Sequence, residues 1–258
     1  MLKYDEQGTG CPVVLIHGFP LCREMWQPQM AALADAGFRV ICPDLPQFGE
    51  SSLTAEPASM STYADAVIGL LDELGIETAV VGGMSMGGYV LLNLLERYPD
   101  RLRGAMFLVT RASADDAAGK EKRTALAAEV SGGNRMIVPE TFAGVLFAPG
   151  TTQHKPELAA QVRQWMDATS LDGLIAALLA MRDRADYTAK LADYALPALV
   201  VGAEQDQAVP HEHSQVLADG LPNSTLEIIP AAGHMANLEQ SALFNQALLR
   251  FLQQFRAG

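Results

Sequence analysis

Short apolar runs alternate with helix-length stretches along most of this 258-residue chain. Each run is rich in β-branched residues and ends at turn residues, which is the pattern of a buried β-strand. The runs cover residues 13–16, 39–42, 78–81, 105–109, 198–201 and 226–229. Consecutive apolar positions suit a sheet covered on both faces, and alternation with helices favours right-handed crossovers between parallel strands. The sequence therefore predicts an α/β fold with a mostly parallel, twisted sheet flanked by helices.

Four stretches that follow these strands are predicted helices, at residues 25–36, 61–74, 86–97 and 241–255. Ser61 stands at the start of the second, where a serine hydroxyl can accept a hydrogen bond from a free backbone N–H. We therefore expect Ser61 to cap that helix.

One long stretch, residues 112–191, breaks the alternation. It contains three further predicted helices, 115–130, 156–169 and 171–184, and no apolar run of the strand type. Prolines and a Gly-Gly pair mark its joints. We expect one α/β core domain, residues 1–111 and 192–258, interrupted by a helical insertion above the sheet, residues 112–191.

The composition excludes several classes of partner. Lys and Arg number 18 against 30 Asp and Glu, which gives a formal net charge of −12 at pH 7. Without a basic cluster, nothing in the chain can replace counterions on a phosphate backbone. The apolar runs are also far shorter than the ~20 residues of a membrane-spanning helix. We expect neither nucleic acid nor membrane as a partner and, because the first residues lack a secretory apolar core, a cytoplasmic protein.

The three cysteines, Cys11, Cys22 and Cys42, form no CxxC pair, and none has a second Cys or a His two to four residues away. Zinc sites use such short spacings, and an odd number of scattered thiols suits a reducing compartment. The sequence therefore predicts no metal site and no disulfide framework.

A glycine-rich motif, Gly83-Met84-Ser85-Met86-Gly87, stands between the run 78–81 and a predicted helix. A G-x-S-x-G sequence in that setting is typical of a nucleophile elbow, whose sharp turn exposes the serine hydroxyl. The N-terminus of the following helix directs free N–H groups at the site. Ser85 is therefore the candidate nucleophile, and the alternative is a packing turn with an incidental serine.

A serine nucleophile needs a base and an acid that orients the base. Among the five histidines, His234 follows the last predicted strand, where the loops of a parallel sheet gather catalytic groups. We expect His211 and His213 on the surface and His154 in a loop of the insertion. We expect His17 to brace the loop after the first strand. His234 is therefore the candidate base.

The loop after the run 198–201 offers two acids, Glu204 and Asp206. The chain order of nucleophile, acid and base then matches one of the known orders of serine triads. An oxyanion hole is also required, made of backbone N–H groups aimed at the carbonyl oxygen. The N–H of Met86, directly after the nucleophile, and that of Phe19, in the loop after the first strand, are the candidate donors.

These segments together resemble the α/β-hydrolase superfamily over essentially the whole chain. The matching segments are His17-Gly-Phe-Pro20, Pro43-Asp-Leu-Pro-Gln-Phe-Gly-Glu-Ser51, Gly83-Met-Ser-Met-Gly-Gly88, Gly202 with Asp206 and Pro210, and Gly233-His-Met-Ala-Asn-Leu-Glu239. Within the superfamily, the chain is most similar to small bacterial carboxylesterases and 3-oxoadipate enol-lactonase-like hydrolases. The resemblance implies the α/β-hydrolase fold, with residues 112–191 as a helical cap (lid) and the substrate pocket between cap and sheet.

The resemblance favours Asp206 as the acid, because it lies four residues before Pro210 as in the family pattern. The spacing from Gly202 to Asp206 is one residue longer than the common one, so Glu204 stays an alternative. Gln47 stands where relatives usually have glycine, which is expected to alter a loop near the pocket.

The prediction is a serine hydrolase that cleaves a small carboxylic ester through an acyl-enzyme, with the triad Ser85, Asp206 and His234 and no metal or organic cofactor. Relatives that act on epoxides or haloalkanes resemble each other in carrying aspartate at the elbow, so serine argues against both. Phe19-Pro20 directly after His-Gly favours esters and lactones, or a cofactor-free perhydrolase reaction. A non-catalytic ligand-binding protein on the same scaffold is the alternative of another class, and the complete triad argues against it.

Two features bear on the substrate. Methionines flank the candidate nucleophile and base or could reach them from helices: Met84, Met86, Met235, Met25, Met166 and Met181. They indicate either an adaptable apolar acyl pocket or ordinary core filling. Arg111, at the end of a strand, could bind a substrate carboxylate, as an acidic lactone requires, or could pair with Asp115 or Asp116. The negative chain favours a neutral ester unless Arg111 supplies local positive charge.

Overall fold

Seven strands form one sheet in this computed structural model, which describes residues 2–52 and 57–256. The order is β1-β3-β2-β4-β5-β6-β7, and all neighbours are parallel except the edge strand β1, which is antiparallel to β3. The strands are β1 (Tyr4–Gln7), β2 (Cys11–Ile16), β3 (Phe38–Pro43), β4 (Ala79–Met84), β5 (Leu102–Leu108), β6 (Ala198–Ala203) and β7 (Ser224–Ile229). The predicted fold class is confirmed.

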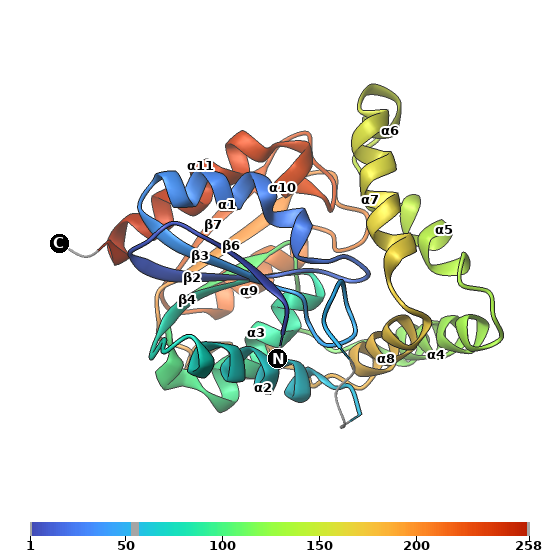
Figure 1. Ribbon diagram of the computed structural model, residues 1–258, viewed down its shortest axis with the longest axis horizontal. Coiled ribbons are helices and arrows are strands. Elements are labelled where there is room, and N and C mark those ends of the chain that lie inside the picture. The colour runs from blue at the N-terminus through green and yellow to red at the C-terminus, as the bar shows by residue number, and fades with distance from the viewer. Residues whose placement is uncertain (1, 53–56, 257–258) are drawn as a thin grey trace.

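Helices cover both faces of this sheet (Figure 1). On one face lie α1 (Gln27–Asp35) and α11 (Ser241–Leu252); on the other lie α2 (Met60–Glu73), α3 (Met86–Arg97) and α9 (Glu212–Gly220). Burial on both faces of the sheet explains why the apolar residues of strand β2 are consecutive. Val13 and Leu15 belong to the core cluster under α1 and α11, whereas Val14 and Ile16 belong to the cluster under α2 and α3.

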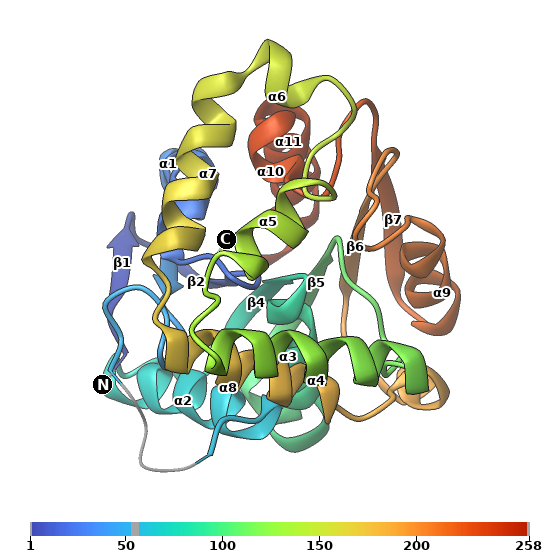
Figure 2. The same cartoon turned by 90° about the vertical axis from the view of Figure 1, so that its right-hand side faces the viewer.

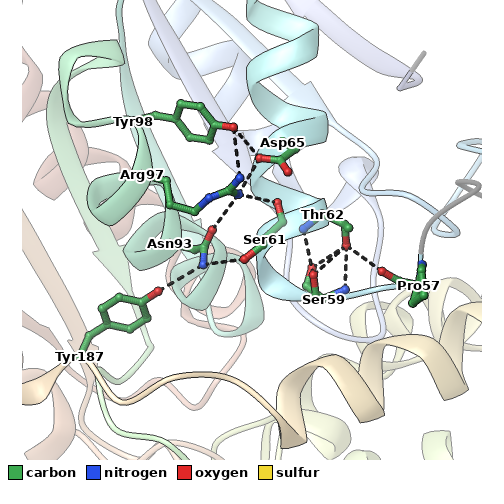
Figure 3. Close-up of polar contacts among 9 residues, drawn as sticks. All are labelled: Pro57, Ser59, Ser61, Thr62, Asp65, Asn93, Arg97, Tyr98 and Tyr187. Atoms are coloured by element: carbon green, nitrogen blue, oxygen red, sulfur yellow. Dashed lines mark hydrogen bonds and ion pairs between the residues drawn. The ribbon is translucent and has the colours of Figure 1, made fainter.

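Helix α2 begins one residue earlier than predicted, at Met60, and Ser61 does not cap it. Ser59 is the N-cap: its hydroxyl accepts from the Thr62 N–H at 3.0 Å, and the Thr62 hydroxyl accepts from the Ser59 N–H at 2.7 Å (Figure 3). Ser61 instead accepts from the Asn93 amide at 3.2 Å, and the same amide donates to the Tyr187 hydroxyl at 3.2 Å. Ser61 therefore helps to join α2, α3 and the chain that returns from the insertion.

The insertion, residues 112–191, is called the cap segment below. Its helices are α4 (Ala117–Ser131), α5 (Ile137–Ala143), α6 (Thr151–His154), α7 (Pro156–Ala168) and α8 (Leu171–Arg182), and they gather at one end of the sheet (Figures 1 and 2). Apolar residues of α4 and α8 join the core cluster of α2 and α3, whereas those of α7 join the cluster of α1. The cap segment thus packs on both core layers. None of the helices in the described ranges is long and apolar enough to cross a membrane.

Candidate active site

Ser85 occupies the tight turn between β4 and α3. Its backbone has φ +51° and ψ −112°, a region that residues other than glycine rarely adopt. Two neighbours hold it there: the Ser85 N–H donates to the Leu108 carbonyl at 3.0 Å, and the Ser85 carbonyl accepts from the Thr110 hydroxyl at 2.7 Å. Strand β5 therefore fixes the turn from the side.

The glycines of the motif are required by close backbone approach. A Cβ at Gly83 would collide with the carbonyl of Gly87, and a Cβ at Gly87 would collide with the backbone of Ile16 and His17. The second collision means that α3 starts directly against the end of β2. The spacing G-x-S-x-G thus brings Ser85 close to the loop that follows β2.

The two candidate oxyanion donors lie beside this turn. Met86 is the first residue of α3, so its N–H has no acceptor within the helix. The Gly18 carbonyl accepts from the Leu21 N–H at 3.0 Å and contacts His17 Nδ1 at 2.9 Å. Because C=O and N–H point in opposite directions across a trans peptide, the Phe19 N–H is directed away from those partners. Gly18 itself lies against Ser85, since a Cβ there would be 3.4 Å from the Ser85 Cβ.

His17 is fully buried and fixes this peptide. The Leu45 N–H donates to His17 Nε2 at 3.0 Å, so the ring is neutral at that nitrogen and its proton lies on Nδ1, facing the Gly18 carbonyl. Burial lowers the pKa of His17, and the nearby Asp44 carboxylate and the bond to Gly18 offset this only in part. His17 therefore braces the loop, as expected from the sequence, and stays uncharged at neutral pH.

His234 and Asp206 form a buried pair at the ends of β7 and β6. His234 Nδ1 lies 2.7 Å from Asp206 Oδ2, and Asp206 Oδ1 accepts from the N–H groups of Ala208 at 2.8 Å and Val209 at 2.9 Å. The carboxylate is thereby held on both oxygens, and His234 Nε2 is left to exchange protons. Glu204 lies elsewhere, exposed, where it accepts from the Ala231 N–H at 2.9 Å.

The loop that carries His234 is bonded to the cap segment. The buried Glu239 carboxylate accepts from the Gly233 N–H on one oxygen and from the Ala148 N–H on the other, each at 2.9 Å. The Met235 N–H donates to the Leu146 carbonyl at 2.9 Å. A Cβ at Gly233 would collide with the backbone of residues 147–148. The base is thus positioned partly by residues 146–148 of the cap segment.

A cavity of about 70 Å³ brings these groups together. Its walls come from loops after β2, β4, β5, β6 and β7 and from cap helices; the lining residues are Phe19, Ser85, Tyr89, Arg111, Arg123, Phe142, Met181, Ala208, Val209 and His234. The predicted nucleophile and base therefore line the same cavity. We refer to this cavity as the catalytic cavity.

The methionines divide between core and cavity. Met181 lines the catalytic cavity, whereas Met84, Met86 and Met235 are fully buried in the two core clusters. Met25 and Met166 are also core residues. The structure therefore places Met84 and Met235 in the core beneath the site rather than on the cavity wall, because alternation along β4 turns Met84 toward the α1 side of the sheet.

Of the two alternatives for Arg111, the structure shows pairing with Asp115, and binding of a substrate carboxylate stays a prediction. Arg111 lines the catalytic cavity, and it also forms an ion pair with Asp115. The same carboxylate pairs with Arg123 and, at 2.9 Å, with Arg184. Burial raises the pKa of Asp115, but the hydrogen bonds and charges of Arg184 and Arg123 outweigh it and lower that pKa to about 2. Asp115 is therefore ionised at neutral pH.

Sequence reasoning missed five residues of the cavity wall: Tyr89, Arg123, Phe142, Ala208 and Val209. Tyr89 has a signal in the sequence, since it lies one helical turn after Ser85 and so on the side of α3 that faces the site. Arg123 has none, because its neighbours in α4 are alternately charged and alanine-rich. Its place on the wall depends on how α4 packs beside α8.

Comparisons with known proteins agree with this geometry. A family model described as alpha/beta hydrolase fold matches residues 12–241. The 3-oxoadipate enol-lactonase 2 of Acinetobacter baylyi is 30% identical over 231 residues, which are 90% of this chain and 84% of that protein. A thermophilic esterase from Thermogutta terrifontis, solved with malate bound, has a TM-score of 0.96 and 37% identity over 99% of this chain and 94% of that one. The enol-lactonase of Burkholderia xenovorans LB400, at 24% identity, shares the fold with a TM-score of 0.90 over 97% and 96% of the two chains.

Proposed function

Because this chain belongs to the alpha/beta hydrolase family, we propose that it is a serine hydrolase that cleaves small carboxylic esters through an acyl-enzyme on Ser85. One observation carries the proposal: His234, paired with Asp206 at 2.7 Å, lines the same cavity as a serine held in a strained, half-buried turn. The enol-lactonase and the esterase among the relatives support hydrolysis of a carboxylic ester bond.

The reaction then follows from the positions of these groups. His234 Nε2 takes the proton of the Ser85 hydroxyl as its oxygen attacks the ester carbonyl carbon. The negative charge that develops on the carbonyl oxygen is stabilised by the N–H groups of Phe19 and Met86. The C–O bond breaks, and His234 returns its proton to the leaving alcohol. Asp206 keeps the ring in the Nδ1–H tautomer and stabilises its charged form.

Water repeats these steps on the acyl-enzyme. His234 removes a proton from a water molecule, the hydroxide oxygen attacks the acyl carbon, and Ser85 leaves with the proton that His234 returns. The products are the free acid and the regenerated enzyme. No group outside the described residues is required for this sequence.

The size of the catalytic cavity favours short acyl groups. About 70 Å³ is small beside the ~300–1,000 Å³ of typical ligand pockets. An acetyl group fits this space, whereas an octanoyl group requires the cap segment to move. We expect kcat/KM for p-nitrophenyl esters to fall from acetate and butyrate to octanoate.

The test compares Ser85→Ala, Asp206→Asn and Glu204→Gln with the wild type on p-nitrophenyl acetate. We expect Ser85→Ala and Asp206→Asn each to lower kcat by about 10⁴-fold or more, because the nucleophile or the tautomer of the base is lost. Glu204→Gln is the matched control, since it removes the other acid of the same loop, and its activity should stay within about twofold of wild type.

An active Ser85→Ala variant would contradict the mechanism. A fluorophosphonate probe gives a second readout, because it labels an activated serine without turnover of an ester. If the wild type neither hydrolyses short esters nor reacts with this probe, the protein is a ligand-binding member of the family. If Glu204→Gln loses activity and Asp206→Asn keeps it, the acid has been misassigned.

A further inference from the structure

We propose that Arg111 and Arg123 form a carboxylate-binding subsite of the catalytic cavity, so that the preferred substrates are short esters or lactones that carry a free carboxylate. The choice of an ester or lactone rests on the proposed function. Binding of the carboxylate does not, because it depends only on the two arginines.

The charge of the cavity wall is the first observation. Of the residues that line the cavity in the described part of the chain, two are arginines and none is Asp or Glu. The chain as a whole carries a net charge of −12. Positive charge is therefore concentrated at the cavity that Ser85 and His234 line.

Asp115 does not neutralise this charge. Three guanidinium groups, those of Arg111, Arg123 and Arg184, surround its single carboxylate. Asp206, another carboxylate of the site, is committed to His234 and to two backbone N–H groups. Arg184 also interacts electrostatically with Asp186. Asp115 therefore faces both Arg111 and Arg123, and at least one positive charge has no partner within this group of residues.

The three arginines are not equivalent. The Arg184 side chain is only 2% exposed and lies over the Tyr89 ring at 4.2 Å, so it is packed behind the wall. Arg111 and Arg123 keep 24% and 18% of their side-chain surface exposed, and both line the cavity. Arg184 and Asp115 thus hold the other two guanidinium groups in place.

Unused hydrogen-bond donors point to the same ligand. Within residues 2–52 and 57–256, Arg111 Nε is buried and has no acceptor. Arg123 uses Nε for Asp115 and Nη1 for the Met181 sulfur at 3.4 Å. A buried donor without a partner is costly, and a planar carboxylate is the group that a guanidinium binds through two parallel hydrogen bonds.

The subsite also restricts the spacer between the carboxylate and the ester. Both groups must reach a cavity of about 70 Å³, so a short spacer is favoured over a long one. Half-esters of short dicarboxylic acids such as succinate have only two methylene groups between the carboxylate and the ester. Their neutral isosteres, in which an isopropyl group replaces the carboxylate, have the same size and lack the charge.

The kinetic test measures kcat/KM for monoethyl succinate and for ethyl 4-methylpentanoate by pH-stat. We expect the wild type to prefer the acidic ester by at least tenfold. In Arg111→Gln/Arg123→Gln, kcat/KM for the acidic ester should fall at least tenfold more than kcat/KM for the neutral ester, so that the preference is lost. Arg182→Gln, which removes one positive charge from an exposed ion pair at the end of α8, should keep the preference.

Arg111→Lys keeps the charge but loses the planar guanidinium group, so it should retain part of the preference for the acidic ester. It should also fold even if a glutamine variant does not. Equal loss of both substrates in folded variants would overturn the proposal, because it would make the arginines structural. A wild type that prefers the neutral ester would also overturn it.

A binding measurement separates the subsite from the reaction. Succinate and neutral succinamide are titrated into Ser85→Ala by calorimetry at fixed ionic strength. Binding of succinate alone, lost in Ser85→Ala/Arg111→Gln/Arg123→Gln, supports the subsite even if the protein hydrolyses no ester. Failure of succinate to bind would overturn the subsite even if the Ser85 mechanism holds.

Discussion

Ser85 and His234 line the same cavity, but different parts of the chain hold them. The turn at Ser85 is fixed by Leu108, Thr110 and glycine contacts between β2, β4 and α3, all within the core domain. The loop of His234 is fixed from the other side, by the Glu239 carboxylate and by residues 146–148 of the cap segment. The geometry of the nucleophile is therefore a property of the sheet, whereas that of the base depends on the cap.

The largest expected effect tests how contacts with the sheet fix the turn at Ser85. Gly87→Ala places a Cβ against the backbone of Ile16 and His17, which cannot move without displacing β2. We expect the free energy of unfolding to fall by about 3 kcal/mol. Urea denaturation followed by circular dichroism measures it.

Gly69→Ala is the matched control for that change. Gly69 lies on the exposed side of α2, and a Cβ there meets nothing within 4 Å. Alanine should stabilise this helix by about 0.5–1 kcal/mol. If Gly87→Ala is as harmless as Gly69→Ala, close approach of α3 and β2 does not explain the motif.

The next largest effect tests how the cap segment positions the loop of His234. Glu239→Gln turns an NH₂ group toward a backbone N–H of either Gly233 or Ala148, so one buried donor loses its acceptor. We expect a loss of about 1–3 kcal/mol in stability. Because the loop of His234 then loses a fixed position, kcat should fall by roughly tenfold, while labelling of Ser85 by a fluorophosphonate continues at a reduced rate.

Thr151→Val is the control for Glu239→Gln. The Thr151 hydroxyl donates to Glu239 at 2.7 Å from α6, yet it touches neither Gly233 nor His234. Its loss should change kcat by less than threefold. Equal kcat values for Glu239→Gln and wild type would show that the cap does not position the base.

The smallest effect concerns the oxyanion loop, through protonation of His17. The pKa of His17 in the folded state lies below the value near 6.5 that histidine has in an unfolded chain. Below pH 6.5, the unfolded state therefore binds a proton that the folded state does not bind. The stability it contributes is present above pH 6.5 and is lost as the pH falls toward the folded pKa. We expect a slope approaching 1.4 kcal/mol per pH unit, measured by urea unfolding between pH 8 and 5.

Two other groups need to be separated from His17. Burial, aided by the charge of Arg111, also lowers the pKa of His213, which adds a change of the same sign. Asp115, with a pKa of about 2, contributes only below about pH 4. His213→Gln should keep most of the slope, and its complete loss in that variant would assign the effect to His213 instead.

The sequence was sufficient for those parts of the site that lie at strand ends. Ser85, Asp206 and His234 each follow a parallel strand, and parallel strands bring such positions to one edge of the sheet. The position of α4 beside α8 is set by tertiary packing, so the local sequence around Arg123 did not indicate its place on the cavity wall. Arg111 was posed as a choice between Asp115 and a ligand, yet a side chain with several donors can face both.

Local boundaries were the other weak point. Ser59 and Ser61 are both plausible helix caps, and only the reciprocal bonds with Thr62 distinguish them. Gln47 does adopt a φ of +73°, the left-handed conformation for which glycine is usual. The sequence alone marked this position as unusual without showing why glutamine is tolerated there.

The contacts of Gly233 and Glu239 also limit how this protein can be engineered. A chimera that carries a foreign cap on this core treats cap and core as interchangeable parts. Here a graft that replaces residues 144–151 would bring an unmatched backbone against Gly233 and leave Glu239 without Ala148. A chimera should keep the host sequence at this junction and exchange only the helices on either side of it.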